Sequence, residues 1–484
     1  MSEQTSRRQF LKTSTVLAAG ATLAGGLSIT QSAHAQGSDE MKVALIGAGG
    51  RAGGAIRDRA QVGDNYKVVA VADVFAERAR VAANGLRNDG QNSESHLYGK
   101  VDLPNDRVFG GMLSYKEAIE SLDPGDMVVI ARQPGLHPYA YRAAVERGCH
   151  VFIEKPICVD APGFRHTMES NRIAEEKGLK VVVGFQRRYE QHYNTWMERI
   201  HAGAIGDIQY TRVFWNGGGI WQRPRNRNES ELAFQLRNWY HFTWLCGDNI
   251  CEQHCHNIDI GNWIHSKGDR MAHPVRANAM GGRLHRAGPE HLMRQAPPFA
   301  DREAWEEWFQ PIRGSFNRNG QAWDSYFVEF EYADGSRMYS QCRHVANVWD
   351  HQTEYAFGTR GWGRPGRLGT GQREGQQETW RNEGRFPKGS MQWEHDVLVD
   401  AIRNDKPLHD GWHASMACMA AVLGREAAYC GRIVNWNELV ERGRPYHPNG
   451  EITSMDDASP VQPDANGFYE STVAVPGQYN PFVS

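Results

Sequence analysis

A short apolar run followed by a glycine-rich turn constrains this chain more than any other feature. The run covers residues 41–46, MKVALI, and the turn GAGGRA follows at residues 47–52. A helical stretch to about residue 60 and a second apolar run at residues 66–72 complete the order strand, turn, helix, strand. This order is typical of the βαβ unit that binds a dinucleotide in an α/β fold.

The turn also predicts which residues contact the dinucleotide. Its first glycine permits the tight turn, its second lets the backbone approach a pyrophosphate, and a small third residue lets the helix pack on the strand. Because Asp73 closes the second strand, its carboxylate is expected to bind the ribose 2′-hydroxyl and to repel a 2′-phosphate. We therefore expect NAD rather than NADP, held by Asp73 together with Gly47, Gly49, Gly50, Arg51 and Ala52.

The N-terminal segment has the anatomy of a twin-arginine export signal. Arg7 and Arg8 precede a mildly apolar run, residues 16–29, and a small-x-small cleavage site at residues 33–35. The run is shorter than the roughly 20 residues that a membrane-spanning helix needs, so a cleaved signal is favoured over a retained anchor. We predict a signal at residues 1–35, the twin-arginine translocase as export partner, no permanent membrane anchor and a periplasmic location. Because this route exports folded proteins, a nucleotide cofactor has to be loaded before export, and we expect it to be held tightly.

Length, charge and composition limit the partners of the chain. Its 484 residues exceed one ordinary domain of roughly 100 to 200 residues, so we expect two closely packed domains. The formal charge of -3, with acidic and basic residues interspersed, provides no basic stripe for nucleic acid and no polybasic patch for lipid. The many Trp and Tyr offer flat faces that suit carbohydrate rings, although aromatic residues more often form core. The cysteines form no Cys-x-x-Cys pair, and folding before export argues for free, buried thiols. A small, neutral molecule is the expected partner.

The parallel pattern continues beyond the first unit. Two further helix and strand pairs are expected, at residues 114–121 with 126–131 and at residues 139–147 with 150–153. Glu154, Lys155 and Pro156 close the last of these strands. Because ligands bind outside the carboxyl ends of parallel strands, Lys155 is expected at the ligand crevice.

Together with later segments, these features resemble the Gfo/Idh/MocA family of glucose-fructose oxidoreductases and inositol dehydrogenases. The resemblance covers residues 41–436 and rests on the glycine turn, Asp73, MVVIAR before Pro134 and His137, HVFIEKP, VVVGFQRRY and DAIRNDKPL. It implies an N-terminal Rossmann domain and a second, α+β domain built on a large, mostly antiparallel sheet. In that arrangement the open face of the second sheet covers the nicotinamide and the sugar.

The resemblance also implies the domain organisation. We expect the Rossmann domain at residues 36–157, a substrate and oligomerisation domain at residues 158–440, and an extended C-terminal arm at residues 441–484. The arm is rich in Pro, Asp, Gly and Ser and can wrap a neighbouring subunit of a homo-oligomer, which we expect to be a dimer or tetramer. Alternation and turn residues predict antiparallel strands at residues 208–216, 326–332 and 337–343, and periodicity predicts helices at residues 393–405 and 412–430.

Oxidising a sugar hydroxyl needs a hydride acceptor, a base for the hydroxyl proton and groups that hold the alcohol. NAD is the acceptor, and the resemblance gives Lys155 the acid–base role. The pKa of lysine is ordinarily about 10.4, and burial and the positive nicotinamide are expected to lower it toward neutrality. Further cofactor contacts are expected at the strand ends, from Pro134, His137, Glu154 and Lys155.

The segment CEQHCHNID at residues 251–259 carries the second catalytic cluster. The resemblance aligns Glu252 and His256 with an acid and a histidine that face the substrate, and the spacing i, i+4 puts both on one face of a helix. His254 is additional and is expected near the substrate. If the segment is extended instead, all three side chains point one way and form a metal-ligand set. We expect no metal, but this alternative and that of histidines satisfied inside a helix stay open.

Further substrate contacts are expected from four residues. The resemblance suggests Arg188 and Tyr189, and the aromatic run at residues 239–244 suggests Trp239 and Tyr240, which could stack on a sugar or form a subunit interface. The favoured function is an NAD-dependent oxidoreductase acting on a sugar or cyclitol. The alternatives are a redox-neutral glycoside hydrolase or epimerase that regenerates its NAD, and a non-catalytic sugar-binding protein.

Overall fold

The computed structural model describes residues 40–483, apart from residues 64, 284–297, 299, 305–306, 309–319, 385, 387, 447–449, 466 and 468. The export signal predicted at residues 1–35 lies outside the described residues. Two β-sheets with helices on their faces make up the described part, and both belong to one compact unit, residues 38–484.

The first sheet has six parallel strands in the order β3-β2-β1-β4-β5-β6, which is the order of a Rossmann domain. Its strands are β1 (Met41–Ile46), β2 (Tyr66–Asp73), β3 (Val108–Gly110), β4 (Met127–Ile130), β5 (His150–Ile153) and β6 (Val181–Val183). The helices between them are α2 (Gly50–Ala60), α3 (Ala76–Gln91), α4 (Ser114–Glu120), α5 (His137–Arg147) and α6 (Ala161–Glu176), with short 3-10 turns at Asn105–Arg107 and Pro134–Leu136. Because helices cover both faces of the sheet, its inner strands are continuous apolar runs.

The glycine turn leads from β1 into α2 as predicted. Gly47 has φ +93°, and a Cβ at this position would lie 2.4 Å from the carbonyl oxygen of Ala131. Only glycine therefore fits both the left-handed conformation and the close approach of β4. The sixth strand, β6, follows the expected domain boundary at residue 157, so the parallel sheet continues into the segment assigned to the second domain.

The second sheet has nine strands in the order β14-β13-β12-β11-β7-β10-β9-β8-β15. Its strands are β7 (Ile208–Gly217), β8 (Arg276–Gly282), β9 (Ser325–Glu331), β10 (Arg337–His344), β11 (His351–Gly358), β12 (Gly361–Arg364), β13 (Arg367–Thr370), β14 (Glu378–Arg381) and β15 (Val434–Asn435). The prediction of a Rossmann domain followed by a large, mostly antiparallel sheet is confirmed, as is the hairpin between β9 and β10.

One strand pair differs from the prediction. β7 was expected among antiparallel strands, but it pairs in parallel with β10 and antiparallel with β11. The alternation of polar and apolar residues in β7 reports that one face is buried, and it carries no information on the direction of the neighbouring strand. The parallel pair therefore could not be read from the alternation.

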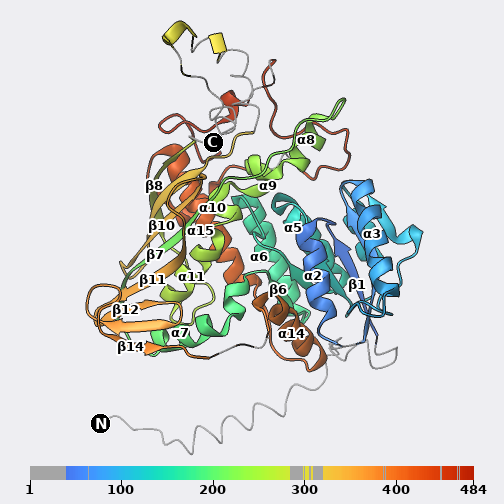
Figure 1. The fold of residues 1–484 in the computed structure, drawn as a ribbon, viewed down its shortest axis with the longest axis horizontal. Helices are drawn as coiled ribbons and strands as arrows, with labels where there is room; N and C mark the ends of the chain where they lie inside the picture. The colour runs from blue at the N-terminus through green and yellow to red at the C-terminus, as the bar shows by residue number, and fades with distance from the viewer. Residues whose placement is uncertain are drawn as a thin grey trace, which may run out of the picture. The chain divides into compact units, whose positions relative to one another are not determined.

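Further helices follow β6 in the chain. They are α7 (Gln191–His201), α8 (Glu231–Arg237), α9 (Thr243–Cys246), α10 (Asn249–Glu252), α11 (Cys255–Ser266), α14 (Ser390–Arg403), α15 (Gly411–Cys430) and α16 (Trp436–Arg442), with 3-10 turns at Gln186–Tyr189, Trp239–His241 and Glu470–Thr472. α15 is buried along nearly its whole length, and it contacts β8 and β9 on one side and α6 and β6 on the other (Figure 1). α14 packs on α2 of the Rossmann domain and so brings a late segment of the chain to the glycine turn.

The C-terminal arm packs against its own chain. The backbone N–H of Tyr446 donates to Asp160 Oδ2 at 2.8 Å, and Gln235 Nε2 donates to the carbonyl of Val461 at 2.6 Å. Lys116 Nζ lies 2.7 Å from Glu451 Oε2. These contacts attach the arm to α6, to α8 and to α4 in turn.

The cysteines match the expectation from the sequence, because all eight are buried and free. Within the described part of the chain, no helix combines the length and the apolar character that crossing a membrane requires.

Gly135 tests how tightly the two domains are packed. A Cβ on Gly135 would lie 1.9 Å from the backbone carbonyl oxygen of Trp244, which cannot move without shifting α9. We expect Gly135→Ala to lower the free energy of unfolding by about 1 to 3 kcal/mol, as overpacking does, in a urea titration. Gly85→Ala in α3 is the matched control, because no atom lies within 4 Å of its Cβ position. The free energy of unfolding of the control should rise by about 0.4 to 1 kcal/mol. Equal stability of the two variants would contradict the close packing.

Candidate active site

A cavity of about 440 Å³ lies at the carboxyl ends of the parallel strands, within the usual size range of small-molecule sites. The Rossmann side and the neighbouring turn contribute Arg51, Ala131, Arg132, Pro134, Glu154, Lys155, Gly184 and Gln186. Later segments contribute Trp215, Trp239, Tyr240, Glu252, Gln253, His256 and Met391. The cavity therefore brings together eight of the residues predicted from the sequence: Arg51, Pro134, Glu154, Lys155, Trp239, Tyr240, Glu252 and His256.

The glycine turn is shaped to accept a pyrophosphate. A Cβ built on Gly49 or on Gly50 meets no atom within 4 Å, so the N-terminus of α2 is open on this side. Asp73 Oδ2 accepts a hydrogen bond from the N–H of Ala48 at 2.8 Å, and Oδ1 accepts one from the N–H of Phe75 at 2.9 Å. Because a carboxylate can accept about four hydrogen bonds, Asp73 can hold the turn and still bind ribose hydroxyls. These residues fit NAD.

Arg51 stands between the cofactor turn and the cavity. Its Nε donates to Glu154 Oε1 at 2.6 Å, and its guanidinium lies 3.9 Å from Glu394 Oε2. A Cβ on Gly184 would lie 2.8 Å from both carboxylate oxygens of Glu154, so only glycine leaves room for this ion pair. Glu394 is fully buried on α14, and burial together with the nearby Glu154 raises its pKa well above the ordinary value. The pair fixes Arg51 beside the phosphate-binding end of α2.

Lys155 is held by the second domain. Its Nζ donates to the carbonyl oxygen of Glu252 at 2.6 Å and lies 3.2 Å from Glu252 Oε1. The hydroxyl of Tyr240 donates to Glu252 Oε2. The expected lowering of the lysine pKa does not hold in this structure: burial lowers the pKa of Lys155, but the charges of Glu252, Cys255 and Glu154 outweigh it and the pKa is raised. The carboxylate of Glu252 beside the amine is the main reason why the pKa is raised.

The segment at residues 251–259 is helical but interrupted. α10 ends at Glu252 and α11 begins at Cys255, so Glu252 and His256 do not share one continuous helix as expected, although both line the cavity. His254 does not line it: the ring is buried and its Nε2 lies 2.8 Å from Ser340 Oγ on β10. The extended conformation that would form a metal-ligand set is therefore not adopted. Among the described residues, no group of three or more His, Cys, Asp or Glu is placed to hold a metal ion.

His256 is packed between aromatic rings. It stacks on Trp215 with ring centroids 5.9 Å apart and meets the edge of Phe185 at 5.7 Å. Burial, together with the charges of Lys155 and Arg187, lowers its pKa well below the ordinary value. The imidazole is therefore neutral at physiological pH and can either donate or accept one hydrogen bond at the cavity.

The remaining predicted residues lie outside the cavity. His137 is buried, its Nδ1 lies 2.8 Å from the carbonyl oxygen of Pro156, and burial lowers its pKa to about 4. It supports the turn that carries Lys155. Arg188 binds Asp259 through two hydrogen bonds of 2.7 and 2.9 Å, and the hydroxyl of Tyr189 donates to Asp410 at 2.6 Å. Their polar groups are thus committed to the protein itself.

The cavity also contains residues that the sequence did not single out. Trp215 points to the same face of β7 as Val213, which packs against Gly261 of α11. The cavity is therefore reached from the helix-covered face of the second sheet, and not from its open face as expected. Arg132 lies two residues after the end of β4 and could have been found from its place beyond a strand end, as Lys155 was. Met391 comes from α14, and nothing in the local sequence indicates this distant contact.

Comparison with known families agrees with this geometry. Residues 41–185 match the model of an oxidoreductase family with an NAD-binding Rossmann fold, Gfo/Idh/MocA, and residues 4–24 match the model of the twin-arginine signal sequence. Residues 41–185 are thus similar to the NAD-binding domain of this family. The match confirms the NAD-binding domain predicted from the glycine turn, and the second match indicates export by the twin-arginine pathway.

Related proteins extend the comparison. The chain is 31% identical over 172 residues to an inositol 2-dehydrogenase of Streptomyces avermitilis, covering 35% of this chain and 43% of the relative. It is 28% identical over 167 residues to inositol 2-dehydrogenase 3 of Saccharopolyspora erythraea, covering 34% and 42%. The chain thus spans less than half the length of these curated relatives.

Solved structures share the fold over both sheets. An aldose-aldose oxidoreductase from Caulobacter crescentus superposes with a TM-score of 0.55 at 16% identity, covering 82% of this chain and 99% of that one. A scyllo-inositol dehydrogenase from Lactobacillus casei with NAD(H) and scyllo-inositol superposes with a TM-score of 0.54 at 18% identity, with the same coverage. These solved structures thus share the two-sheet fold of the chain.

Asp73 provides the test of the cofactor assignment. Asp73→Asn keeps an acceptor for the glycine turn and removes the charge, so NAD binding should weaken by roughly 1.5 to 3 kcal/mol and the preference over NADP should narrow. Isothermal titration of both nucleotides into the apoprotein measures this. Glu94→Gln, an exposed carboxylate outside the cavity, is the control and should change neither affinity. Equal binding of NAD and NADP to the unaltered protein would contradict the assignment.

Proposed function

We propose that this chain is an exported, periplasmic oxidoreductase that uses tightly bound NAD to oxidise a hydroxyl group of a sugar or cyclitol. The observation that carries the proposal is Lys155, whose amine is held by Glu252 inside the cavity at the end of β5. The names of the relatives, inositol 2-dehydrogenases, support the substrate class. The twin-arginine match supports the location and the need to retain the cofactor.

The proposed chemistry assigns one task to each residue. Bound NAD would supply the hydride acceptor. Lys155 takes the hydroxyl proton, and for this its amine has to be neutral. Glu252 Oε1 lies 3.2 Å away, and its charge raises the pKa of Lys155. The positive charge of a bound nicotinamide would act in the opposite direction and favour the neutral amine.

The remaining cavity residues orient the substrate. His256, Tyr240 and Gln253 provide hydrogen-bonding groups of both kinds, which matches the alternating donors and acceptors of vicinal hydroxyls. Trp215 and Trp239 provide flat apolar faces for the C–H side of the ring. Positioning of this kind places the reacting C–H bond against the cofactor, where misplacement by about 1 Å costs roughly a hundredfold in rate.

The first test concerns Lys155. Lys155→Ala should keep a folded core and bound NAD while single-turnover reduction of NAD by a panel of sugars and cyclitols falls by about 10² to 10⁴, because a proton-transfer group acts mainly in the transition state. Lys180→Ala is the control, since Lys180 is a similarly buried lysine that pairs with Asp405 outside the cavity. Protein from the periplasmic fraction is used, and absorbance of the reduced nicotinamide is followed. Near-normal reduction of NAD in Lys155→Ala would show that Lys155 is not the base. Product formation without net reduction of NAD would favour the redox-neutral alternative.

The second test uses pH. The charge of Glu252 raises the pKa of Lys155, so Glu252→Gln should lower it. Because the neutral amine is the active form, the rate rises with pH up to this pKa, and in Glu252→Gln the rise should occur at lower pH. The measurement is the pH profile of kcat in the cofactor-loaded enzyme. Glu190→Gln, a carboxylate outside the cavity, should leave the profile in place. A rise that stays where it was in Glu252→Gln would mean that Lys155 is not the titrating base.

A further inference from the structure

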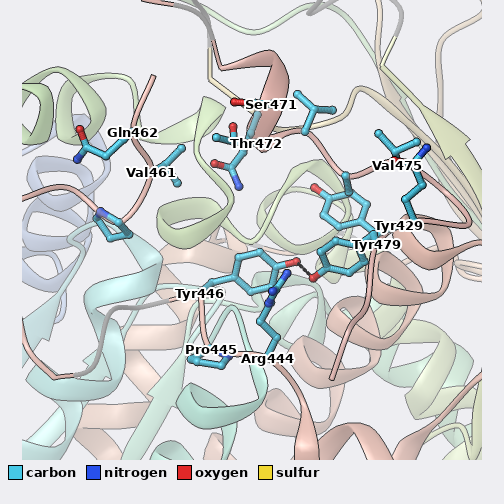
Figure 2. Close-up of a pocket in the computed structure, with 15 residues that line it drawn as sticks. Tyr429, Arg444, Pro445, Tyr446, Val461, Gln462, Ser471, Thr472, Val475 and Tyr479 are labelled. Atoms are coloured by element: carbon cyan, nitrogen blue, oxygen red, sulfur yellow. Dashed lines mark hydrogen bonds between the residues drawn. The ribbon is translucent and has the colours of Figure 1, made fainter. Parts of the chain in front are cut away.

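A second cavity, of about 460 Å³, lies under the C-terminal arm. Figure 2 shows its residues arranged around an opening: Tyr446 and Tyr479 lie in the middle with their hydroxyls together, while Ser471 and Thr472 lie above them and Gln462 and Val461 to one side. The cavity is separate from that at Lys155, with which it shares no lining residue.

The lining of this second cavity is polar, and burial raises the pKa of its three tyrosines, Tyr429, Tyr446 and Tyr479, above the ordinary value. It offers hydroxyls, side-chain amides and tyrosine rings, together with proline and valine, and among the described lining residues Arg444 is the one that is charged. No Asp, Glu, His, Lys or Cys is among the described residues that line it. Such a site is suited to hold a neutral molecule that both donates and accepts hydrogen bonds, and it is not equipped to transform one.

One polar atom in the lining lacks a partner. The side chain of Gln321 is 8% exposed, and its Oε1 has no hydrogen bond. The backbone around it is fixed, because the N–H groups of Gln321 and Ala322 both donate to the carbonyl oxygen of His241, at 2.9 and 3.1 Å. An unsatisfied buried acceptor costs roughly 1 to 3 kcal/mol, and a ligand hydroxyl would remove that cost.

The tyrosine rings are held in place before any ligand arrives. The hydroxyl of Tyr446 bonds to that of Tyr479, and Tyr479 donates to Glu426 Oε2 at 2.9 Å. Glu426 is itself paired with the buried Arg425 at 2.7 Å. Because these contacts fix the rings, binding a ligand against them costs little ordering of side chains.

We propose that the arm cavity is a second, non-catalytic binding site for a neutral polyhydroxylated ring, that is, a sugar or cyclitol. Fixed aromatic rings, hydroxyl and amide groups of both hydrogen-bonding kinds, and an unpaired acceptor at Gln321 meet in one place. This combination matches the two faces and the hydroxyl edge of such a ring. The site is independent of the chemistry at Lys155.

Hydrogen exchange locates the site directly. The cofactor-loaded protein is incubated with D-glucose, N-acetyl-D-glucosamine, myo-inositol or sucrose, and amide exchange is read by mass spectrometry in peptides covering residues 320–323 and 469–479. At a ligand concentration of about ten times Kd, exchange through local opening should slow about tenfold for at least one of these compounds. The peptides around Glu252 report the first cavity separately, so failure of one site does not hide the other.

Two variants separate binding from structure. Ser471→Trp fills the cavity from its exposed rim and should abolish protection of the arm, whereas Ser93→Trp, an exposed serine that lines neither cavity, should leave it intact. Gln321→Leu removes the unpaired acceptor at similar volume, so it should weaken protection at least tenfold without lowering the unfolding midpoint. A purely structural glutamine would instead lose stability on this change.

Three results would overturn the proposal. In the first, none of the four compounds slows amide exchange in the arm. In the second, the slowing persists in Ser471→Trp. In the third, exchange slows as the protein concentration rises, although no sugar is present. The last would identify a contact between two copies of the chain, which light scattering would confirm.

Discussion

The buried ion pair of Lys155 and Glu252 joins the two domains at the point where the proposed chemistry takes place. Lys155 follows β5 of the parallel sheet and Glu252 ends α10 of the second domain, so the pair forms only when both have folded and docked. Removing two charges from water costs several kcal/mol per ion, and only good geometry and further hydrogen bonds offset it. Here the backbone carbonyl of Glu252 and the hydroxyl of Tyr240 provide them. The cavity, its aromatic residues Trp215, Trp239 and Tyr240, and the break between α10 and α11 are arranged around this pair.

Much of the fold followed from local rules. The glycine turn, the acid at the end of β2 and the alternating helices and strands predict a Rossmann domain because each depends on residues close in sequence. The direction of β7 relative to β10 did not follow, since alternation reports burial and not strand polarity. Likewise the spacing of Glu252 and His256 suggested one helix, but the chain breaks between them, and there His254 bonds to Ser340 on β10, a strand far along the chain.

The site residues likewise fall into those that local sequence predicts and those that depend on distant parts of the chain. Residues at strand ends, such as Lys155 and Glu154, could be placed from the sequence because parallel sheets bind ligands at that edge. Trp215 and Met391 could not, because they reach the cavity from a different sheet and from α14. The pKa of Lys155 shows the same limit: the sequence indicated burial, whereas the carboxylate that outweighs burial in this structure comes from α10. Electrostatics at a domain junction depend on tertiary neighbours.

The return of the arm to the first domain affects the order of events during biosynthesis. Glu451 bonds to the hydroxyl of Tyr115 and to Lys116 Nζ, and Tyr446 bonds to Asp160, so segments made early are covered by segments made much later. During synthesis α4 and α6 therefore stay uncovered until Tyr446 and Glu451 have left the ribosome. A signal that matches at residues 4–24 is thus available to its receptor long before the fold behind it is complete.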